Sequence, residues 1–436
     1  MERRQTSERE DGRVQQALDR RQARDDAIEA LIKEGWEKLR PAWERLYAIE
    51  TANQRRVIEA FQQCGVRSFH LQSGTGYGYD DPAREITEAV YASVFQGEAA
   101  IVRPQIASGT HALWICLDAL LRDGDHLLMV SGPPYDTLRH AITGPSPHSL
   151  RNKGVAYSEA PLTPDGRLDF DAIGRLVTPK TRILFLQRSK GYMWRPGLGA
   201  EAVEALAAWR DRHAPGAIVM VDNCYGEFVE EREPCAAGAD LAAGSLIKNP
   251  GGTLAPAGGY IVGRGELIEV IAERVTAPGL GLHVGPTLGT ARSVLQGLFL
   301  APHLVAEALA GLLLASYTME ALGYEVTPRH VEPPRDSVLA VRLGDPELLL
   351  AFCRSVQAAS PVDSDARPEP GPLPGYEHQV VMAAGTFVQG ASSEFTADGP
   401  VRPPFAAFLQ GGISRVQISL ALPRILRVLA AHRAEG

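Results

Sequence analysis

Residues 99–120 read AAIVRPQIASGTHALWICLDAL, a short apolar strand followed by a Ser-Gly-Thr turn and an apolar helix. Similar strand and helix units alternate as far as about residue 263. The expected strands are Ala99–Val102, His126–Val130, Arg182–Leu186, Ala217–Val221, Ala243–Ile247 and Tyr260–Val262. The expected helices are Thr110–Leu121, Asp169–Leu176 and Ala200–Arg210. This alternation predicts an α/β fold, a mainly parallel sheet with helices on both faces.

The regions on either side of this alternation have different patterns. Apolar residues at helical spacing from Ile28, including Trp36 and Trp43, predict N-terminal helices that end at Gly65. The first 25 residues look disordered or loosely helical. The C-terminal third combines expected helices at 294–322 and 346–357, an irregular loop at 360–375, and expected strands Ser337–Leu343, Gln379–Met382 and Arg415–Leu420. We therefore expect an N-terminal helical arm at 1–65, a large domain at 66–310 and a small α+β domain at 311–436.

Composition and charge exclude several classes of protein. The formal net charge of −8 argues against a nucleic-acid partner. Five cysteines without a CxxC pair argue against a disulfide framework and a structural zinc site, and favour a cytoplasmic location. The N-terminus lacks the apolar core of a signal peptide. The most apolar stretch, 294–317, is interrupted by polar residues and Pro302, so we expect a buried helix pair and no membrane contact.

Two charged residues stand at expected strand ends, where α/β sheets bind their ligands. Asp222 ends the apolar run 217–222, and its carboxylate can hold a positive charge. A helix cap is the alternative, and no histidine or glutamate at ligand spacing supports a metal site. Lys248 ends the run 244–248 before a Pro-Gly-Gly turn. Its apolar strand should lower its pKa and suit it to Schiff-base chemistry, unless it is only a surface lysine in a turn.

Two further strand ends carry a small-residue turn and an aromatic ring. Ser108, Gly109 and Thr110 open a helix whose N–H groups and dipole favour an anion, although an ordinary capped helix has the same pattern. Tyr135 is placed to stack on a planar cofactor or simply to pack. Each signal is weak alone. Together, the anion site, ring, carboxylate and lysine match the phosphate, ring face, pyridinium nitrogen and aldehyde carbon of pyridoxal phosphate (PLP).

With these residues in place, the sequence resembles fold-type I PLP enzymes. More narrowly, it resembles the aluminium-resistance or methionine gamma-lyase-like group, relatives of the cystathionine beta- and gamma-lyases. The resemblance covers about residues 25–430. Its main segments are SGTGYGYDDPAR (73–84), RPQIASGTHAL (103–113), QRSKGYMWRP (187–196), VDNCYGEFVE (221–230), GSLIKNPGGTLAPAGGYIVG (244–263), GTFVQGASSEFTADGPVR (385–402) and RVQISLAL (415–422). It implies a mainly parallel seven-stranded sheet.

The resemblance also implies roles for the residues around the cofactor. Lys248 would carry the internal aldimine, Asp222 would keep the pyridine nitrogen protonated, and Tyr135 would stack on the ring. The phosphate would be held by four residues of the same chain: Ser108, Gly109, Thr110 and Ser245.

Other implied contacts involve a second subunit and the substrate. Tyr77 or Tyr79 would reach the phosphate bound by a neighbouring subunit, which implies a homodimer or homotetramer with active sites at the subunit interface. Arg415, with Arg402 as the second choice, would bind the carboxylate of an amino-acid substrate.

The resulting hypothesis is a PLP-dependent carbon–sulfur lyase that performs α,β- or β,γ-elimination on a sulfur-containing amino acid. Lys248 would act as the base at the α-carbon, and Tyr135 could supply a second acid. An aminotransferase or a β/γ-replacement synthase in a dedicated pathway is the alternative, because the same carbanion serves all of these reactions. A PLP-containing DNA-binding regulator is disfavoured, since residues 1–65 show no helix-turn-helix with a basic patch.

Overall fold

The computed structural model describes residues 21–435, so the expectation for residues 1–20 lies outside the described residues. Residues 21–38 are helical, and α2 (Arg40–Gln63) follows directly. Residues 21–25, expected to be flexible, belong to the first helix, and Asp25 pairs with Arg427 at 2.7 Å. The indole of Trp43 donates to the Ala310 carbonyl. The N-terminal helices therefore pack on the C-terminal part of their own chain.

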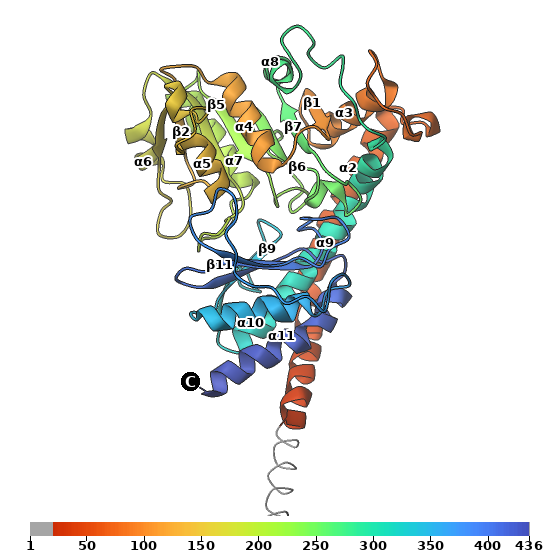
Figure 1. Cartoon of the computed structure of the whole chain (residues 1–436), viewed down its shortest axis with the longest axis vertical. Coiled ribbons are helices and arrows are strands. Elements are labelled where there is room, and N and C mark those ends of the chain that lie inside the picture. Colours follow the sequence, from red (N-terminus) through yellow and green to blue (C-terminus); the bar gives the residue numbers. More distant parts are fainter. Residues whose placement is uncertain (1–20, 436) are drawn as a thin grey trace, which may run out of the picture.

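A seven-stranded sheet forms the upper half of the molecule (Figure 1). In the order β1-β7-β6-β5-β4-β2-β3, only β7 runs antiparallel to its neighbours, which confirms the predicted α/β fold. The short strand β3 was not predicted, because its residues AYSE form no apolar run. The strands are β1 (Ala99–Arg103), β2 (His126–Met129), β3 (Ala156–Glu159), β4 (Thr181–Gln187), β5 (Ile218–Asp222), β6 (Leu241–Ser245) and β7 (Gly259–Gly263).

Helices cover both faces of this sheet. Successive side chains of a strand enter different core layers, as Leu127 and Leu128 of β2 show. The helices α4 (Gly109–Leu120), α5 (Asp136–Thr143) and α8 (Gly265–Val275) pack on the layer that holds Leu127. On the layer that holds Leu128 pack α3 (Pro82–Val94), α6 (Phe170–Leu176) and α7 (Ala200–His213).

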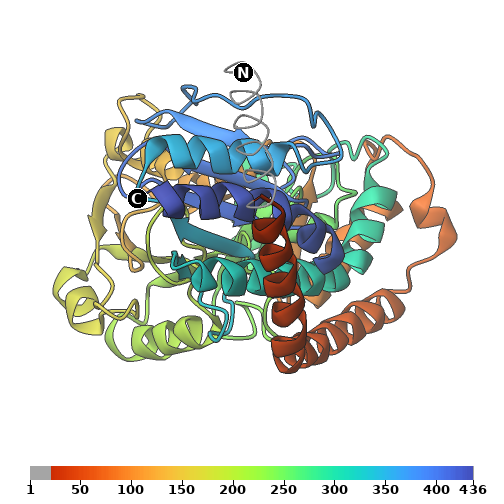
Figure 2. The ribbon, with the colours of Figure 1, turned by 90° about the horizontal axis from the view of Figure 1, so that it is seen from below.

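A five-stranded antiparallel sheet, in the order β10-β11-β12-β9-β8, forms the C-terminal part and confirms the expected α+β character. Its strands are β8 (Glu325–Thr327), β9 (Val338–Arg342), β10 (Val380–Ala383), β11 (Thr396–Pro400) and β12 (Ala406–Gln410). The helices α10 (Pro346–Gln357) and α11 (Arg415–Glu435) lie side by side on one face (Figure 2). The other face of this small sheet is turned toward the large sheet (Figure 1).

The expected strand Arg415–Leu420 is wrong, because these residues begin α11. The alternation of Val416, Ile418 and Leu420 suggested a strand with one buried face. In the structure Ile418 is buried, whereas Val416 and Leu420 are 52% and 78% exposed. The core contacts continue at Leu422, Ile425 and Leu429, which have helical spacing.

The expected helix pair near residue 300 is one helix, α9 (Ala291–Ala321), with Pro302 inside it. This helix is long and apolar enough to cross a membrane, but 72% of its most apolar window is buried within the protein. It packs along α2 and α11, as a core helix does (Figure 1). The predicted domain boundary at 310/311 falls inside α9, and the division into three parts stays a prediction.

An ion pair without solvent contact joins the two sheets. Lys190 follows β4 and Asp336 precedes β9, and the Lys190 Nζ lies 2.6 Å from the Asp336 Oδ1, with both side chains 1% exposed. Lys190 also donates to the Val338 carbonyl at 2.8 Å. These bonds tie the small sheet to the end of β4.

We expect Lys190→Met to lower the free energy of unfolding by about 3–5 kcal/mol, because it leaves the Asp336 carboxylate buried without a cation. Urea denaturation followed by circular dichroism measures this loss. The double variant Lys190→Met/Asp336→Leu should recover most of it, since neither charge is then buried alone. Lys38→Met, at an exposed pair with Glu34, is the control and should change nothing measurable. A stable single variant would show that the pair does not hold the sheets together.

Candidate functional site

A cavity of about 310 Å³ lies between the carboxyl ends of the large sheet and the open face of the small sheet. This size suits a small organic ligand. The seven cofactor residues that the resemblance placed within one chain all line it: Ser108, Gly109, Thr110, Tyr135, Asp222, Ser245 and Lys248. Leu373, from the irregular loop expected at 360–375, lines it as well.

One end of the cavity is the N-terminus of α4. The Ser108 hydroxyl caps the helix by accepting from the His111 N–H at 3.1 Å. A Cβ at Gly109 would lie 3.1 Å from the Cys224 Sγ and 3.3 Å from the Ser245 Cβ, so a glycine lets the helix start close to β6. The first N–H groups of a helix have no partner within it, and the helix dipole favours a negative charge there. This end of the cavity therefore fits an anion.

Tyr135 stands beside this helix end. Its hydroxyl lies 2.9 Å from the Thr110 hydroxyl, and its backbone N–H donates to the Gln187 side chain at 3.0 Å. Burial and the nearby Asp222 carboxylate raise the pKa of the Tyr135 phenol well above its ordinary value. The hydroxyl consequently keeps its proton at neutral pH.

Asp222 ends β5 and is 3% exposed. Its Oδ1 accepts from the Cys224 N–H at 3.1 Å. Burial raises the pKa of Asp222, partly offset by the Lys248 charge. Cys224 is buried, and its pKa is raised by burial and by Asp222, so its thiol keeps its proton at neutral pH.

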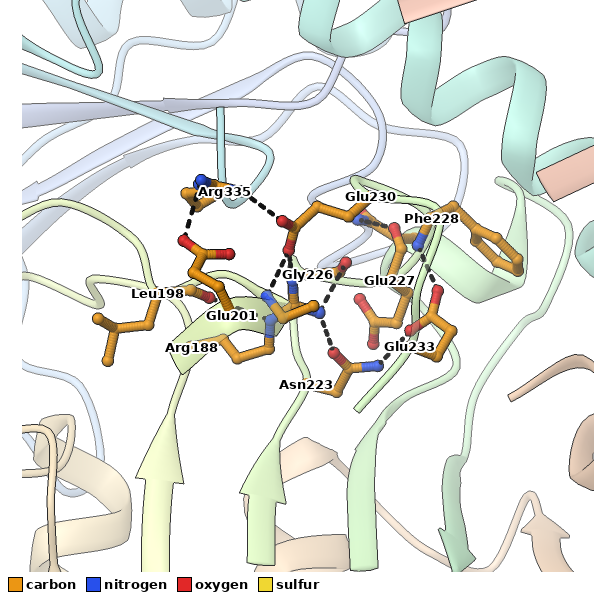
Figure 3. Close-up of polar contacts among 12 residues, drawn as sticks. Arg188, Leu198, Glu201, Asn223, Gly226, Glu227, Phe228, Glu230, Glu233 and Arg335 are labelled. Carbon is orange, nitrogen blue, oxygen red and sulfur yellow. Dashed lines mark hydrogen bonds and ion pairs between the residues drawn. The ribbon is translucent and has the colours of Figure 1, made fainter. Parts of the chain in front are cut away.

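A polar network fixes the chain immediately after Asp222 (Figure 3). The Arg188 guanidinium donates to the Asn223 side chain at 2.7 Å and to the Glu230 carboxylate at 2.6 Å. Asn223 in turn donates to Glu233 at 3.1 Å, and Glu230 pairs with Arg335. Because Arg335 lies just before β9, this network also reaches the small sheet.

Lys248 lies in the turn after β6, at the start of the short helix η3 (Asn249–Gly251). The strand ends at Ser245, so the expectation that Lys248 closes the strand is off by three residues. Gly252, with φ of +51°, packs on α9, and a Cβ there would lie 2.0 Å from the Gly297 carbonyl oxygen. This close approach holds the lysine turn against α9.

The expectation of a lowered pKa for Lys248 is wrong. Burial alone lowers the pKa of its ammonium, but the surrounding acidic groups outweigh burial and raise it well above its ordinary value. These groups are Cys224, Tyr225, Asp222 and Tyr135. The Lys248 Nζ also lies 3.9 Å from the centre of the Tyr225 ring.

The small sheet supplies a second polar wall that sequence reasoning missed. Tyr225, a non-glycine residue with φ of +69°, donates its hydroxyl to Gln410 at 2.9 Å. Gln410 donates to the Asp398 carboxylate at 3.0 Å. Tyr192 lines the same cavity, as do three buried hydroxyls without a hydrogen-bond partner: Ser189, Ser392 and Thr396. Except for Gln410, these residues lie in the segments 187–196, 221–230 and 385–402, so polar side chains there were the available signal.

The tyrosines of the N-terminal loop do not reach this cavity. Tyr77 and Tyr79 are 71% and 74% exposed. The loop itself is anchored, because the buried Arg84 guanidinium donates to the carbonyls of Gly76, Gly78 and His283.

The structure does not bring Arg415 to the cavity, which corrects its predicted role. Its guanidinium pairs with Glu307 and lies 4.9 Å from the centre of the Trp43 ring. The predicted role of Arg415 assumed that a strand begins at this residue, but the helix α11 begins there instead. Arg402 lies closer, in a neighbouring cavity of about 70 Å³ that shares Tyr135 and Tyr192 with the main one.

Comparisons with known proteins agree with this geometry. The model of the methionine gamma-lyase family matches residues 28–430. The uncharacterized Bacillus subtilis protein YnbB is 45% identical over 377 residues, 86% of this chain and 90% of YnbB. A Listeria monocytogenes structure, a proposed cystathionine beta-lyase involved in aluminum resistance, is 42% identical with a TM-score of 0.89. The alignment covers 92% of this chain and 99% of the other.

A carbon–sulfur lyase involved in aluminum resistance from Clostridium novyi is 39% identical, with a TM-score of 0.87 over 92% of this chain and 95% of the other. The chain therefore belongs to the methionine gamma-lyase family, the aluminium-resistance relatives of the cystathionine lyases and synthases in the fold-type I group of PLP enzymes.

Proposed function

We propose that this protein binds PLP through the Lys248 Nζ and eliminates a sulfur leaving group from an amino acid. The observation that supports this proposal is the convergence of a lysine, a buried carboxylate, a protonated phenol and a helix N-terminus on one cavity. The name of the Clostridium novyi relative, a carbon–sulfur lyase, supports the same reaction class.

The residues present fit the cofactor group by group. The N-terminus of α4, with Ser108, Gly109 and Thr110, fits the phosphate, and the glycine leaves room for the close approach to β6. Ser245 lines the same end. Asp222 fits a protonated ring nitrogen, and Tyr135 fits the ring face.

Bound PLP would supply an electron sink for a carbanion at the α-carbon of the substrate. A positive ring nitrogen next to Asp222 would also offset the carboxylate charge that raises the pKa of Lys248. The Lys248 amine is then able to lose its proton and act as the base at the α-carbon. Arg402, in the adjoining cavity, is the cation proposed for the substrate carboxylate.

A screen of amino-acid substrates tests the reaction class. With cysteine, homocysteine and methionine derivatives, we expect a keto acid, ammonia and a free thiol as the products. Pyruvate indicates α,β-elimination and 2-oxobutyrate indicates β,γ-elimination. Transfer of the amino group to a keto acid, or a new carbon–heteroatom bond with an added nucleophile, would instead identify an aminotransferase or a replacement synthase.

Reduction with borohydride tests the lysine assignment. We expect the reduced cofactor to be fixed on the peptide that contains Lys248. Lys248→Ala should lose this label and the visible absorbance of the lysine-bound cofactor, and turnover should fall by about 10²–10⁴-fold, the usual contribution of a general base. Lys153→Ala, at a lysine paired with Asp118 outside the cavity, is the control. Retained absorbance and turnover in Lys248→Ala would exclude Lys248.

We further propose that the chain forms a homodimer in which Tyr77 or Tyr79 binds the phosphate held by the partner subunit. Both rings are exposed on an anchored loop. Tyr77→Phe or Tyr79→Phe should weaken PLP binding by about 1.5–3 kcal/mol, the value of a hydrogen bond to a charged group. Tyr47→Phe, 67% exposed on α2, should have no effect.

Mixed dimers give the decisive measurement of this shared site. A subunit with Lys248→Ala keeps its loop tyrosines, and a subunit with the tyrosine substitution keeps its lysine. Mixing the two should restore one complete site per dimer, and with it activity. A monomer by light scattering, or no recovery on mixing, would contradict the shared site.

A further inference from the structure

The small-sheet wall of the cavity carries a carboxyl group that the proposed roles do not use. Asp398 lies on β11, in register with Met382 of β10 on one side and Phe408 of β12 on the other. It lines the cavity together with Lys248, which comes from the turn after β6. The proposed base and this carboxyl group therefore belong to different sheets and line one space.

The neighbours of Asp398 fix its carboxyl group. The Tyr225 hydroxyl donates to the Gln410 Oε1 at 2.9 Å, so the amide nitrogen of Gln410 is the end that faces Asp398. That nitrogen donates to the Asp398 Oδ1 at 3.0 Å. Tyr192 lines the same cavity, and its phenol lowers the pKa of the carboxyl group. Tyr225 follows β5 of the large sheet, so the Gln410 side chain that binds Asp398 is itself bound across the gap between the sheets.

The charge on Asp398 is poorly stabilised. Burial raises its pKa to about 7, although the hydrogen bond from Gln410, the Tyr192 phenol and the charge of Lys248 oppose this rise. The other titratable groups that face it are phenols and a thiol whose pKa values are all raised by burial: Tyr192, Tyr225, Tyr376 and Cys353. They stay neutral in the range where Asp398 gains and loses its proton.

Tyr135 is less suited to donate a proton to a leaving group. Its hydroxyl is bound to Thr110 at the anion end of the cavity, and its pKa lies well above the ordinary value. An acid transfers a proton most effectively when its pKa lies near the working pH. The pKa of Asp398, about 7, meets this condition. Asp398 lies on the wall of the cavity that the small sheet forms.

We propose that Asp398 is a catalytic acid that protonates the departing sulfur of the substrate, a role that rests on the proposed elimination reaction. The Lys248 amine takes the proton from the α-carbon, and the carbon–sulfur bond breaks with its electron pair on sulfur. In α,β-elimination the electron pair of the broken carbon–hydrogen bond ends in the new C=C bond. The Asp398 proton passes to sulfur, which leaves as a thiol. Solvent then returns a proton to the Asp398 carboxylate and accepts one from the Lys248 ammonium.

Leaving groups that differ in their need for a proton test this role. The probes are the thiol-releasing substrate found in the screen and the chloro-amino acid of the same chain length, for example an S-alkyl cysteine against β-chloroalanine. Asp398→Asn keeps the size of the side chain and an oxygen that can accept from Gln410. We expect it to lower kcat/KM by about 10²–10⁴-fold for the thiol-releasing substrate, the usual contribution of an acid catalyst. For the chloride, which leaves without a proton, we expect little change.

Equal losses for both substrates in Asp398→Asn would show a structural role and overturn the proposal, as would no loss for either. A loss confined to substrates with a cationic side chain would show that Asp398 recognises charge instead. Tyr135→Phe tests the alternative acid. If Tyr135→Phe lowers kcat/KM for the thiol-releasing substrate but not for the chloride, and Asp398→Asn does not, then Tyr135 is the acid. A wild-type protein that eliminates neither probe refutes the proposed function itself, which separates the two failures.

The pH dependence gives an independent readout. The ratio of kcat/KM for the thiol-releasing substrate to that for the chloride cancels the contribution of Lys248, which serves both. This ratio should fall as the pH rises through the pKa of Asp398, about 7, because the acid is then deprotonated. Asp398→Asn should abolish the fall. Tyr192→Phe removes the hydroxyl that lowers the pKa of Asp398, so it should move the fall to higher pH. A ratio that is flat with pH in the wild-type protein would overturn the proposal.

Discussion

The chemistry of this protein depends on how the small sheet is held in place. One of its faces must stay against the carboxyl ends of the strands of the large sheet, because the cavity lies between them. The buried Lys190–Asp336 pair does this at the end of β4, and the Arg188–Glu230–Arg335 network does it at the end of β5. A buried charge without a partner strongly destabilises the folded protein, so each of these charged side chains needs its partner in place. If the small sheet moved away, Lys190 would lose Asp336 and Glu230 would lose Arg335, although Glu230 would keep Arg188. The closed cavity is therefore the arrangement in which the charges are satisfied.

Within that cavity, burial raises the pKa of both carboxyl groups, and their other neighbours differ. Asp222 and Asp398 are both carboxyl groups in little-solvated surroundings, but Asp222 has a backbone N–H and the Lys248 charge close by. Asp398 accepts from the Gln410 amide and also has the Lys248 charge close by, and its pKa rises to about 7. The pKa of both carboxyl groups is thus raised by burial, and their proposed tasks, holding a charge and transferring a proton, differ through their positions in the cavity.

The sequence predicted the parts of the site that depend on local order along one chain segment. Asp222 and Ser108 stand directly at a strand end and a helix start, and parallel strands bring such positions to one edge of a sheet. Lys248 was found for the same reason, although its turn begins three residues earlier than expected. The raised pKa of Lys248 could not be predicted, because it comes from Cys224, Tyr225, Asp222 and Tyr135, which meet it only in the folded chain.

The C-terminal part was harder to predict because its contacts are long-range. Val416, Ile418 and Leu420 alternate as a strand does, and only packing against α9 and α10 selects the helix. Asp398 is unremarkable in the sequence, since its role depends on Gln410, Tyr192 and Tyr225 from three other segments.

This division between the two sheets has a consequence for specificity. The large sheet provides the residues proposed to hold the cofactor, while β11 and β12 provide Thr396, Asp398 and Gln410 on the facing wall. Substitutions on that wall can change which leaving group is accepted without disturbing Lys248 or Asp222. Under the proposed roles, the large sheet holds the cofactor and the base, and the small sheet supplies the acid that meets the leaving group.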